Sequence, residues 1–286
     1  MNTTTDHSLK HSKPFGSLKE NSDANSVLPV NKSYPEKRSE DDLVFFLHIP
    51  KTAGTAIAQA LIPLFPENHI LNHYQVNNVR KHPREIYIRA KFLHGHFTHD
   101  VYSKRLPKQP SFILTFLRDP IAHYVSTFFH LKVDPTFTYT TRLCEEKDLA
   151  KEIHEFVKDR SIDDFLDYEH SEIFNNFQTR YLTKGLSSDY VSWSDKSLLP
   201  VAERMLLNLP FFGITEQLED SLLLLQSSIS APEPLKIEQV NKSRNKPNDY
   251  ALSDSALKKI QDCTEVDQRL YQLAKTAFAD RLWGTT

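Results

Sequence analysis

The sequence contains almost no cysteine and no long apolar run, and each scarcity narrows the kinds of protein it can be. Two of its 286 residues are cysteine, Cys144 and Cys263, so no disulfide framework is indicated and a reducing compartment is the simpler expectation. No segment approaches the roughly 20 apolar residues that a membrane-spanning helix needs. The net charge of −2 gives no general attraction to nucleic acid or anionic membranes. Any anion site must therefore be a local group of basic residues.

The first 40 residues differ in composition from the rest of the chain. They are rich in Ser, Asn, Lys, Glu and Pro, and they lack the short apolar core of a secretory signal. A segment of this composition cannot bury enough apolar surface to stay ordered. We expect a disordered tail over residues 1–40, a single folded domain over residues 41–286, and a cytoplasmic location.

Short apolar runs after the tail predict buried strands. The clearest are Leu43–Ile49, Phe92–Phe97, Phe112–Leu117 and Phe211–Thr215, with a weaker candidate at Ile70–Tyr74. Such continuous runs are typical of parallel strands covered on both faces. Helical patterns follow at 121–131, 147–158, 198–209, 216–226 and 254–281. Alternation of this kind predicts an α/β fold with a P-loop-NTPase-like parallel sheet flanked by helices.

Glycine is scarce too, and its positions are informative. Three of the six glycines, Gly54, Gly95 and Gly213, fall at or beside the ends of predicted strands. Glycine serves where a backbone turns sharply or a ligand approaches closely. This draws attention to the carboxyl ends of the strands, where open α/β sheets bind ligands.

The segment after the first predicted strand has the features of a phosphate-binding loop. It reads His-Ile-Pro-Lys-Thr-Ala-Gly-Thr-Ala from residue 48 and leads into a helix beginning near Thr55. The helix amides point at an anion, Lys51 adds a full positive charge, and the hydroxyls of Thr52 and Thr55 are hydrogen-bond donors. It is not a Walker loop, because Lys51 precedes the loop's only glycine. An ordinary strand-turn-helix junction is the alternative.

A second basic segment follows the Phe112–Leu117 strand. Arg118 ends the strand, Pro120 suits the first turn of the next helix, and Ser126 lies eight residues beyond the arginine. An arginine fork with a hydroxyl from the next helix can grip a second phosphate. Alternatively, Asp119 pairs with Arg118 and both are structural.

Together, Pro-Lys-Thr-Ala-Gly-Thr and Leu-Arg-Asp-Pro-x5-Ser resemble the two nucleotide-binding signatures of sulfotransferases, closest to the carbohydrate branch of heparan sulfate 2-O-sulfotransferases and their bacterial relatives. The resemblance implies a 3′-phosphoadenosine 5′-phosphosulfate donor, a hydroxyl acceptor, in particular a carbohydrate, and no metal. It assigns the 3′-phosphate to Arg118 and Ser126. It assigns the 5′-phosphosulfate to Lys51, Thr52, Ala53, Gly54, Thr55 and Ala56. Ala56 departs from the pattern, because many relatives carry a second hydroxyl there.

A histidine pair lies between the two signatures. His94 and His96 flank Gly95, so on a strand both side chains would point to the same face. Histidine is suited to take a proton near neutral pH, and the resemblance assigns catalysis to this element. We expect His96 to be the base, His94 to assist it, and Lys51 to stabilise the leaving group. The alternatives are two hydrogen-bonded residues at a strand end, and a metal site formed with His99 and Asp100.

Two further segments resemble family elements. The basic loop of Lys242, Ser243 and Arg244 is similar to one that closes over the nucleotide, although a solvated loop is the default. Gln178 and Arg180 resemble a helix near the acceptor side.

Thr215 needs no ligand to explain it, because it suits the N-cap of the following predicted helix.

Two other functions stay open at this stage. One is a P-loop-type phosphotransferase using ATP and Mg²⁺, and the other is a non-catalytic nucleotide- or glycan-binding protein. The missing Walker geometry argues against the first. The presence of a candidate base argues against the second.

Overall fold

The computed structural model describes residues 38, 42–72, 75, 81, 83–99, 106, 108–137, 147–184, 193–237 and 250–284. The predicted tail over residues 1–40 falls outside this part of the chain except for Arg38, so that expectation stays a prediction. In the described part, no helix combines the length and apolar composition needed to cross a bilayer.

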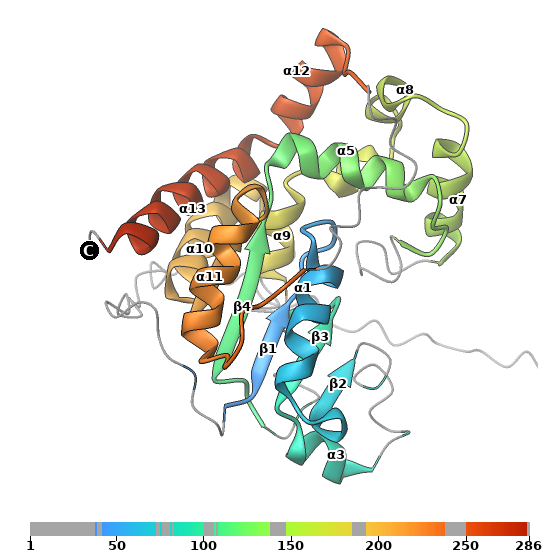
Figure 1. Ribbon diagram of the computed structural model, residues 1–286. Coiled ribbons are helices and arrows are strands. Elements are labelled where there is room, and N and C mark those ends of the chain that lie inside the picture. Colours follow the sequence, from blue (N-terminus) through green and yellow to red (C-terminus); the bar gives the residue numbers. More distant parts are fainter. Residues whose placement is uncertain are drawn as a thin grey trace, which may run out of the picture. The chain divides into compact units, whose positions relative to one another are not determined.

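A five-stranded sheet organises the fold (Figure 1), and each neighbouring pair of strands is parallel. The strand order is β2-β3-β1-β4-β5, so β1 lies at the centre. The strands are β1 Val44–Leu47, β2 Ile70–Asn72, β3 Phe92–Gly95, β4 Phe112–Leu117 and β5 Phe211–Ile214. The predicted α/β class with a parallel sheet flanked by helices is confirmed.

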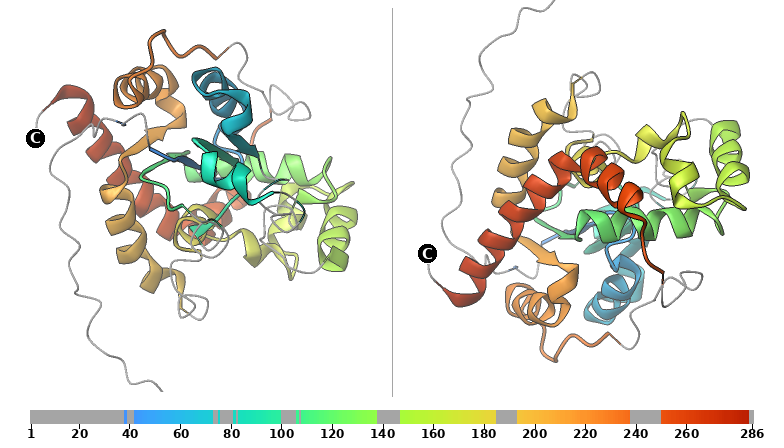
Figure 2. Two further views of the ribbon diagram at one scale, coloured as in Figure 1. Left: turned by 90° about the horizontal axis from the view of Figure 1, so that it is seen from below. Right: turned by 90° about the horizontal axis from the view of Figure 1, so that it is seen from above.

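Helices cover both faces of the sheet. Figure 2 shows α1 and α11 on one face and α9, α10 and α13 on the other. The bounds are α1 Gly54–Leu61, α3 Arg84–Arg89, α5 Pro120–Leu131, α7 Lys147–Val157, α8 Ile162–Leu166, α9 Phe177–Thr183, α10 Asp195–Asn208, α11 Leu218–Ile229, α12 Asp254–Cys263 and α13 Glu265–Trp283. Short 3-10 turns lie at Ile62–Leu64, Glu67–His69, Ser171–Phe174 and Thr215–Gln217.

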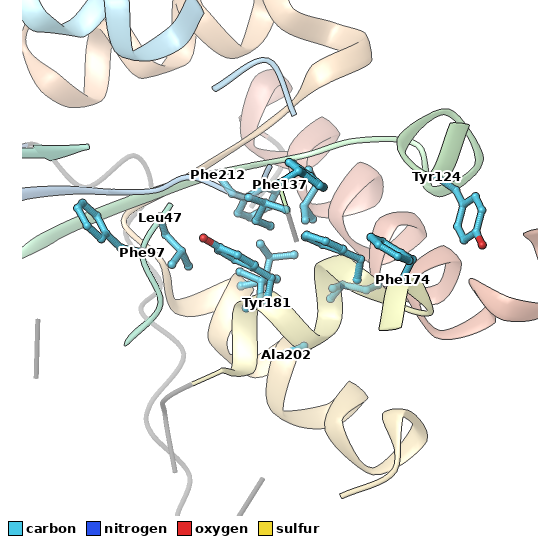
Figure 3. Close-up of a cluster of buried hydrophobic side chains, with 14 of the residues drawn as sticks. Leu47, Phe97, Tyr124, Phe137, Phe174, Tyr181, Ala202 and Phe212 are labelled. Carbon is cyan, nitrogen blue, oxygen red and sulfur yellow. The ribbon is translucent and has the colours of Figure 1, made fainter. Parts of the chain in front are cut away.

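The central strand explains this layering. Along β1, Val44 and Phe46 belong to the core beneath α1 and α11, whereas Phe45 and Leu47 belong to the core on the other face. Side chains of a strand alternate between faces, so a strand that is apolar at every position requires cover on both sides. Figure 3 shows part of the larger core, where Leu47 of β1 lies among aromatic rings from other elements.

Two predicted element boundaries were wrong. Thr215 does not cap a helix, because a 3-10 turn intervenes and α11 begins at Leu218 with Gln217 at its N-cap position. The strand predicted over Phe92–Phe97 ends at Gly95, whose φ of 140° takes the backbone out of the extended conformation. His96 therefore lies beyond the strand.

The last predicted helical segment is two helices rather than one. It breaks at Thr264, whose φ of −114° and ψ of 18° are not helical. The amides of Val266 and Asp267 then donate to Asn176 Oδ1, at 3.0 and 3.1 Å, and α13 starts in a new direction. A side chain from elsewhere in the sequence thus sets this boundary.

Candidate functional site

The loop after β1 has a strained backbone. Lys51 and Ala53 adopt positive φ angles of 69° and 63°, and Ala53 occupies the N-cap position of α1. A left-handed conformation costs about 1–2 kcal/mol for a residue other than glycine. Strain of this kind persists only where surrounding contacts hold the backbone, and it concentrates at functional sites.

The contacts that hold this loop are three side-chain hydrogen bonds. The carbonyl oxygens of residues 49, 50 and 51 each accept one of them. The donors are, in that order, Thr52 Oγ1 at 2.8 Å, His123 Nε2 at 2.8 Å and Arg118 Nη1 at 3.0 Å. Three consecutive carbonyls are thereby fixed, and two of their donors lie more than 60 residues away, one directly after β4 and the other in α5.

The amides of the same loop are short of hydrogen-bond partners within the described chain. No backbone carbonyl of the described residues accepts a well-formed hydrogen bond from the N–H groups of residues 51–55, and the first amide of this stretch to make one is that of Ala56, to Ala53. Consecutive unpaired amides at a helix N-terminus bind anions. This arrangement fits the predicted phosphate-binding role of residues 51–56.

The side chains of the loop divide between structure and solvent. Thr52 is fully buried and its hydroxyl donates to the Ile49 carbonyl, so this proton is engaged within the protein. Thr55 is exposed. Gly54 packs against the His48 ring, and a Cβ at residue 54 would lie 1.9 Å from ring atoms of His48. Only glycine fits there while the ring keeps its place.

Arg118 lies beside the loop, at the carboxyl end of β4. Its backbone N–H donates to Gln178 Oε1 at 2.9 Å, and its carbonyl accepts from Gln178 Nε2 at 2.8 Å. Its Nε lies 3.9 Å from Glu216 Oε1 and is a buried atom with no hydrogen-bond partner in the described part of the chain. The guanidinium therefore retains hydrogen-bonding capacity for an anion.

Asp119 does not make the pairing with Arg118 that was the structural alternative. Its carboxylate accepts from Ala122 N at 2.9 Å and caps α5, and its own N–H donates to Glu216. Aspartate at an N-cap satisfies an amide that the helix leaves open.

One face of α5 lies against the loop. His123 on this face contacts Pro50, Ser126 follows three residues later, and His130 four residues after that. The positive charge of Lys51 contributes to lowering the pKa of both His123 and His130, after the larger effect of burial. Ser126 is buried, and helical spacing places it on the same side of α5 as His123 and His130.

Burial and neighbouring charge also act on Lys51. Desolvation first, and then the Arg118 guanidinium, lower the pKa of the Lys51 amine from 10.5 to about 8, while Asp134 opposes the shift. Two cations that repel one another are thus held close together at the carboxyl ends of β1 and β4. Such an arrangement is expected where an anionic ligand relieves the repulsion.

Three histidines gather at the ends of β1 and β3. The rings of His48 and His96 are 4.4 Å apart, and His94 stacks on Phe92 with ring centres 5.4 Å apart. Burial lowers the pKa of His94, and it lowers that of His48 well below the usual value, with His96, His94 and Lys51 adding to the shift of His48. His96 Nδ1 lies 3.4 Å from the His48 carbonyl, and as a donor to it would leave the lone pair on Nε2.

The alternative metal site receives no support from this geometry. The ring nitrogens of His94, His96 and His99 do not all come within 4.8 Å of one another, and Asp100 lies outside the described residues. Within the described residues, the one group that meets this spacing is Glu152, Glu169 and His170, whose two carboxylate residues are exposed.

The two residues predicted on the acceptor side both make contacts within the chain. Gln178 is 1% exposed, and its amide is engaged by the Arg118 backbone. Arg180 pairs with Asp195 at 2.7 Å and donates to the Glu172 carbonyl at 3.1 Å. Their role in acceptor binding stays a prediction. The predicted nucleotide loop of residues 242–244 lies outside the described residues.

Sequence reasoning missed His123, His48 and the contact of Glu216 with Arg118. His123 stands three residues before Ser126, so helical spacing on one face was a usable signal. His48 was hidden because it continues an apolar run. For Glu216 there was no signal, since nothing in the sequence shows that β5 lies next to β4.

Comparison with known proteins identifies the family. Residues 37–278 match the Sulfotransferase family. The chain belongs to the sulfotransferase family. The match includes both basic segments and the histidine pair, and the confirmed fold agrees with it.

The relatives of this sulfotransferase-family chain are distant. Heparan-sulfate 6-O-sulfotransferase 3-B of Danio rerio is 24% identical over 274 residues, which cover 84% of this chain and 65% of the relative. Heparan-sulfate 6-O-sulfotransferase 1 of Homo sapiens is 23% identical over 277 residues, with 84% and 66% covered. The chain thus spans about two thirds of the length of these relatives. Both are 6-O enzymes by name, and not of the 2-O branch that the motifs suggested.

Proposed function

We propose that this chain transfers a sulfuryl group from 3′-phosphoadenosine 5′-phosphosulfate to a hydroxyl group of a carbohydrate. The observation that carries the proposal is the 3.0 Å hydrogen bond from Arg118 Nη1 to the Lys51 carbonyl, which joins the two basic segments at one sheet edge. A nucleotide with anionic groups at both its 5′ and 3′ positions is the ligand that matches two adjacent basic segments.

The residues at this edge fit such a donor. The open amides of residues 51–55 and the Lys51 amine suit the 5′-phosphosulfate. Arg118 has unused hydrogen-bonding capacity at Nε and, with Ser126, suits the 3′-phosphate. Lys242, Ser243 and Arg244 remain candidates for the nucleotide as well.

The donor supplies an activated sulfate, and the protein's part is to move one proton and to balance charge. As the acceptor oxygen bonds to sulfur, the bond from sulfur to the 5′-phosphate oxygen breaks. The acceptor proton goes to His96, whose Nε2 carries the lone pair when Nδ1 donates to His48. Lys51 neutralises charge on the departing phosphate. His94, neutral because burial lowers its pKa, is the adjacent assisting base.

The acceptor class rests on the relatives. Their names specify the 6-O position of heparan sulfate, and this chain shares the family with them at 23–24% identity. We propose a carbohydrate acceptor, with a sugar 6-hydroxyl as the first position to test. Desulfated heparan oligosaccharides and simple sugars are suitable acceptors for that assay.

The test follows release of adenosine 3′,5′-bisphosphate from the sulfated donor in the presence of each acceptor. His96→Ala is expected to lower turnover by about 10²–10⁴, the range for loss of a general base, with an unchanged dissociation constant for the bisphosphate. His170→Ala, a histidine outside the site, is the control and should match wild type. Wild-type turnover in His96→Ala would remove His96 from the mechanism.

Binding of the nucleotide is tested separately. Arg118→Ala is expected to weaken binding of the bisphosphate by about 1.5–3 kcal/mol, the range for a hydrogen bond to a charged group. Thermal stabilisation by ATP with Mg²⁺ but not by the bisphosphate would overturn the proposal in favour of a phosphotransferase.

A further inference from the structure

Two residues of the C-terminal helix α13 are linked to Arg118, each through one intervening residue. Asp267 and Tyr271 stand one turn apart on α13, so they share a face of that helix. Neither residue contacts the predicted phosphate-binding loop directly. Each is connected to Arg118 through one other side chain, Gln178 in one case and Glu216 in the other.

The first connection fixes the backbone of Arg118. Asp267 is buried and accepts three hydrogen bonds from the start of α9: from Gln178 N at 3.0 Å, from Thr179 N at 2.8 Å and from Thr179 Oγ1 at 2.7 Å. Asn176 in turn accepts the first amides of α13. The two helix N-termini thereby hold one another in place.

Gln178 carries this placement to β4. Its side-chain amide makes one hydrogen bond to the N–H and one to the carbonyl of Arg118, at 2.9 and 2.8 Å. The N–H and carbonyl of one residue in a neighbouring antiparallel strand would make the same pair of contacts. Gln178 is buried and its N–H donates to Asp267. The backbone of Arg118 is therefore held in a fixed position at the end of β4.

The second connection governs the side chain of Arg118. Glu216 Oε2 accepts from Tyr271 Oη at 2.7 Å, and Glu216 Oε1 accepts from Asp119 N at 3.0 Å. With both oxygens engaged, the carboxylate stays 3.9 Å from Arg118 Nε, whereas a charge-assisted hydrogen bond would be about 2.7–2.9 Å. Glu216 thus orients the guanidinium without consuming its donors.

We propose that Gln178 and Glu216 are positioning residues that set the backbone and the guanidinium of Arg118 for a 3′-phosphate, with Asp267 and Tyr271 anchoring them to α13. Preference for a 3′-phosphorylated nucleotide then depends on the C-terminal helix. This inference rests on the proposed function, because it assigns the 3′-phosphate to Arg118.

The experiment compares two nucleotides, adenosine 3′,5′-bisphosphate and adenosine 5′-phosphate, by calorimetry. Tyr271→Phe removes only the hydroxyl that holds Glu216, which is then able to pair fully with Arg118 and compete with the phosphate. We expect binding of the bisphosphate to weaken by roughly a factor of ten, the equivalent of one hydrogen bond, and binding of the 5′-phosphate to stay unchanged.

A matched control exists elsewhere in the chain. Tyr168 Oη donates to Glu152 Oε1 at 2.9 Å, the same kind of contact as that between Tyr271 and Glu216. In the described part of the chain, this pair makes no contact with either basic segment. Tyr168→Phe should therefore leave the affinity for both nucleotides at the wild-type value.

Two further variants separate positioning from a general effect on folding. Gln178→Leu should reduce the preference for the bisphosphate as Tyr271→Phe does, and its melting temperature reports any loss of stability from the buried change. In an Arg118→Ala background, Tyr271→Phe should have no further effect on bisphosphate binding, because the residue through which it acts is gone.

The outcomes distinguish this inference from the proposed function. A wild-type protein that binds both nucleotides equally would refute the 3′-phosphate site, and with it both proposals. A wild-type preference that Tyr271→Phe leaves intact would overturn the positioning role alone. The positioning role would also be overturned if Tyr271→Phe weakens the binding of both nucleotides equally. It would likewise be overturned if Tyr271→Phe still weakens bisphosphate binding in the Arg118→Ala background.

Discussion

At the scale of single residues, the site depends on two cations held where they repel one another. Lys51 has a positive φ and a pKa lowered to about 8, and its carbonyl accepts a hydrogen bond from Arg118. The positive φ has a conformational cost, and the burial of the Lys51 amine beside Arg118 has an electrostatic cost. Phosphate groups at this position would offset the repulsion and favour the charged amine.

The pKa of Lys51 predicts how nucleotide binding varies with pH. Above about pH 8 the amine of the free protein is neutral, so binding a phosphate requires uptake of a proton. Affinity for the bisphosphate should then fall by up to about tenfold per pH unit above the pKa. The measurement is calorimetry from pH 7 to pH 9.5, with Lys51→Arg as the control, since a guanidinium stays charged throughout. A flat profile in wild type would contradict the prediction.

The same shift has a consequence for stability with the opposite sign. The pKa of Lys51 is lower in the folded chain than the ordinary 10.5, so the unfolded chain binds more protons between about pH 8 and 10.5. The contribution of Lys51 to the free energy of unfolding therefore increases with pH over that window. Nucleotide binding and stability of the free protein should thus move in opposite directions there.

At the scale of elements, the helix termini position the site. The N-terminus of α1 presents the open amides, that of α5 follows Arg118 directly, and that of α9 is held by Asp267. The first two lie at the carboxyl ends of β1 and β4, because a connecting helix begins where a strand ends, and the third is linked to the end of β4 by Gln178. The proposed anion site therefore depends on this geometry as much as on its charged side chains.

Two substitutions of Asp119 distinguish its role as the cap of α5 from an effect of its charge on Arg118. Asp119→Ala removes the acceptor for Ala122 N and should lower the free energy of unfolding by about 1 kcal/mol, whereas Asp119→Asn keeps a capping oxygen and should cost much less. Urea denaturation of both variants measures this. Equal and large losses of bisphosphate affinity in both would instead indicate that the carboxylate charge acts on Arg118.

At the scale of the whole molecule, one sheet supports two cores. Phe45 and Phe46 are neighbours in the central strand, both with 0% exposure, and they belong to the cores on opposite faces. Since β1 pairs with β3 on one side and β4 on the other, neither core can be lost without disturbing the strand that carries the site.

This arrangement predicts that the described fold unfolds as one cooperative unit. Phe45→Ala and Phe46→Ala should each lower the free energy of unfolding by about 3–5 kcal/mol and shift a single transition. Leu223→Ala is the control, because Leu223 is 63% exposed and its loss should stay within about 0.5 kcal/mol. Urea titrations followed by circular dichroism and by fluorescence test this, and two separate transitions in either phenylalanine variant would contradict it.

Much of the fold and part of the site were predictable from sequence. The apolar runs at residues 44–47 and 112–117 predicted buried parallel strands, because a strand without polar alternation must be covered on both faces. The predictions failed where a distant residue intervened. The helix break at Thr264 depends on Asn176, and the buried position of Gln178 depends on Arg118.

The sequence by itself determined the fold class and the two basic segments, since both follow from local patterns of apolar and charged residues. Only the tertiary structure decided that Arg118 touches the Lys51 carbonyl, that Asp119 caps α5, and that Gln178 and Glu216 lie at Arg118. The physical reason is that the contacts of Arg118 join residues 60 to 98 positions apart, whereas Asp119 could have been used either as a cap or as an ion-pair partner. Their partners are fixed by the order of the strands and the packing of α13, which no local pattern specifies.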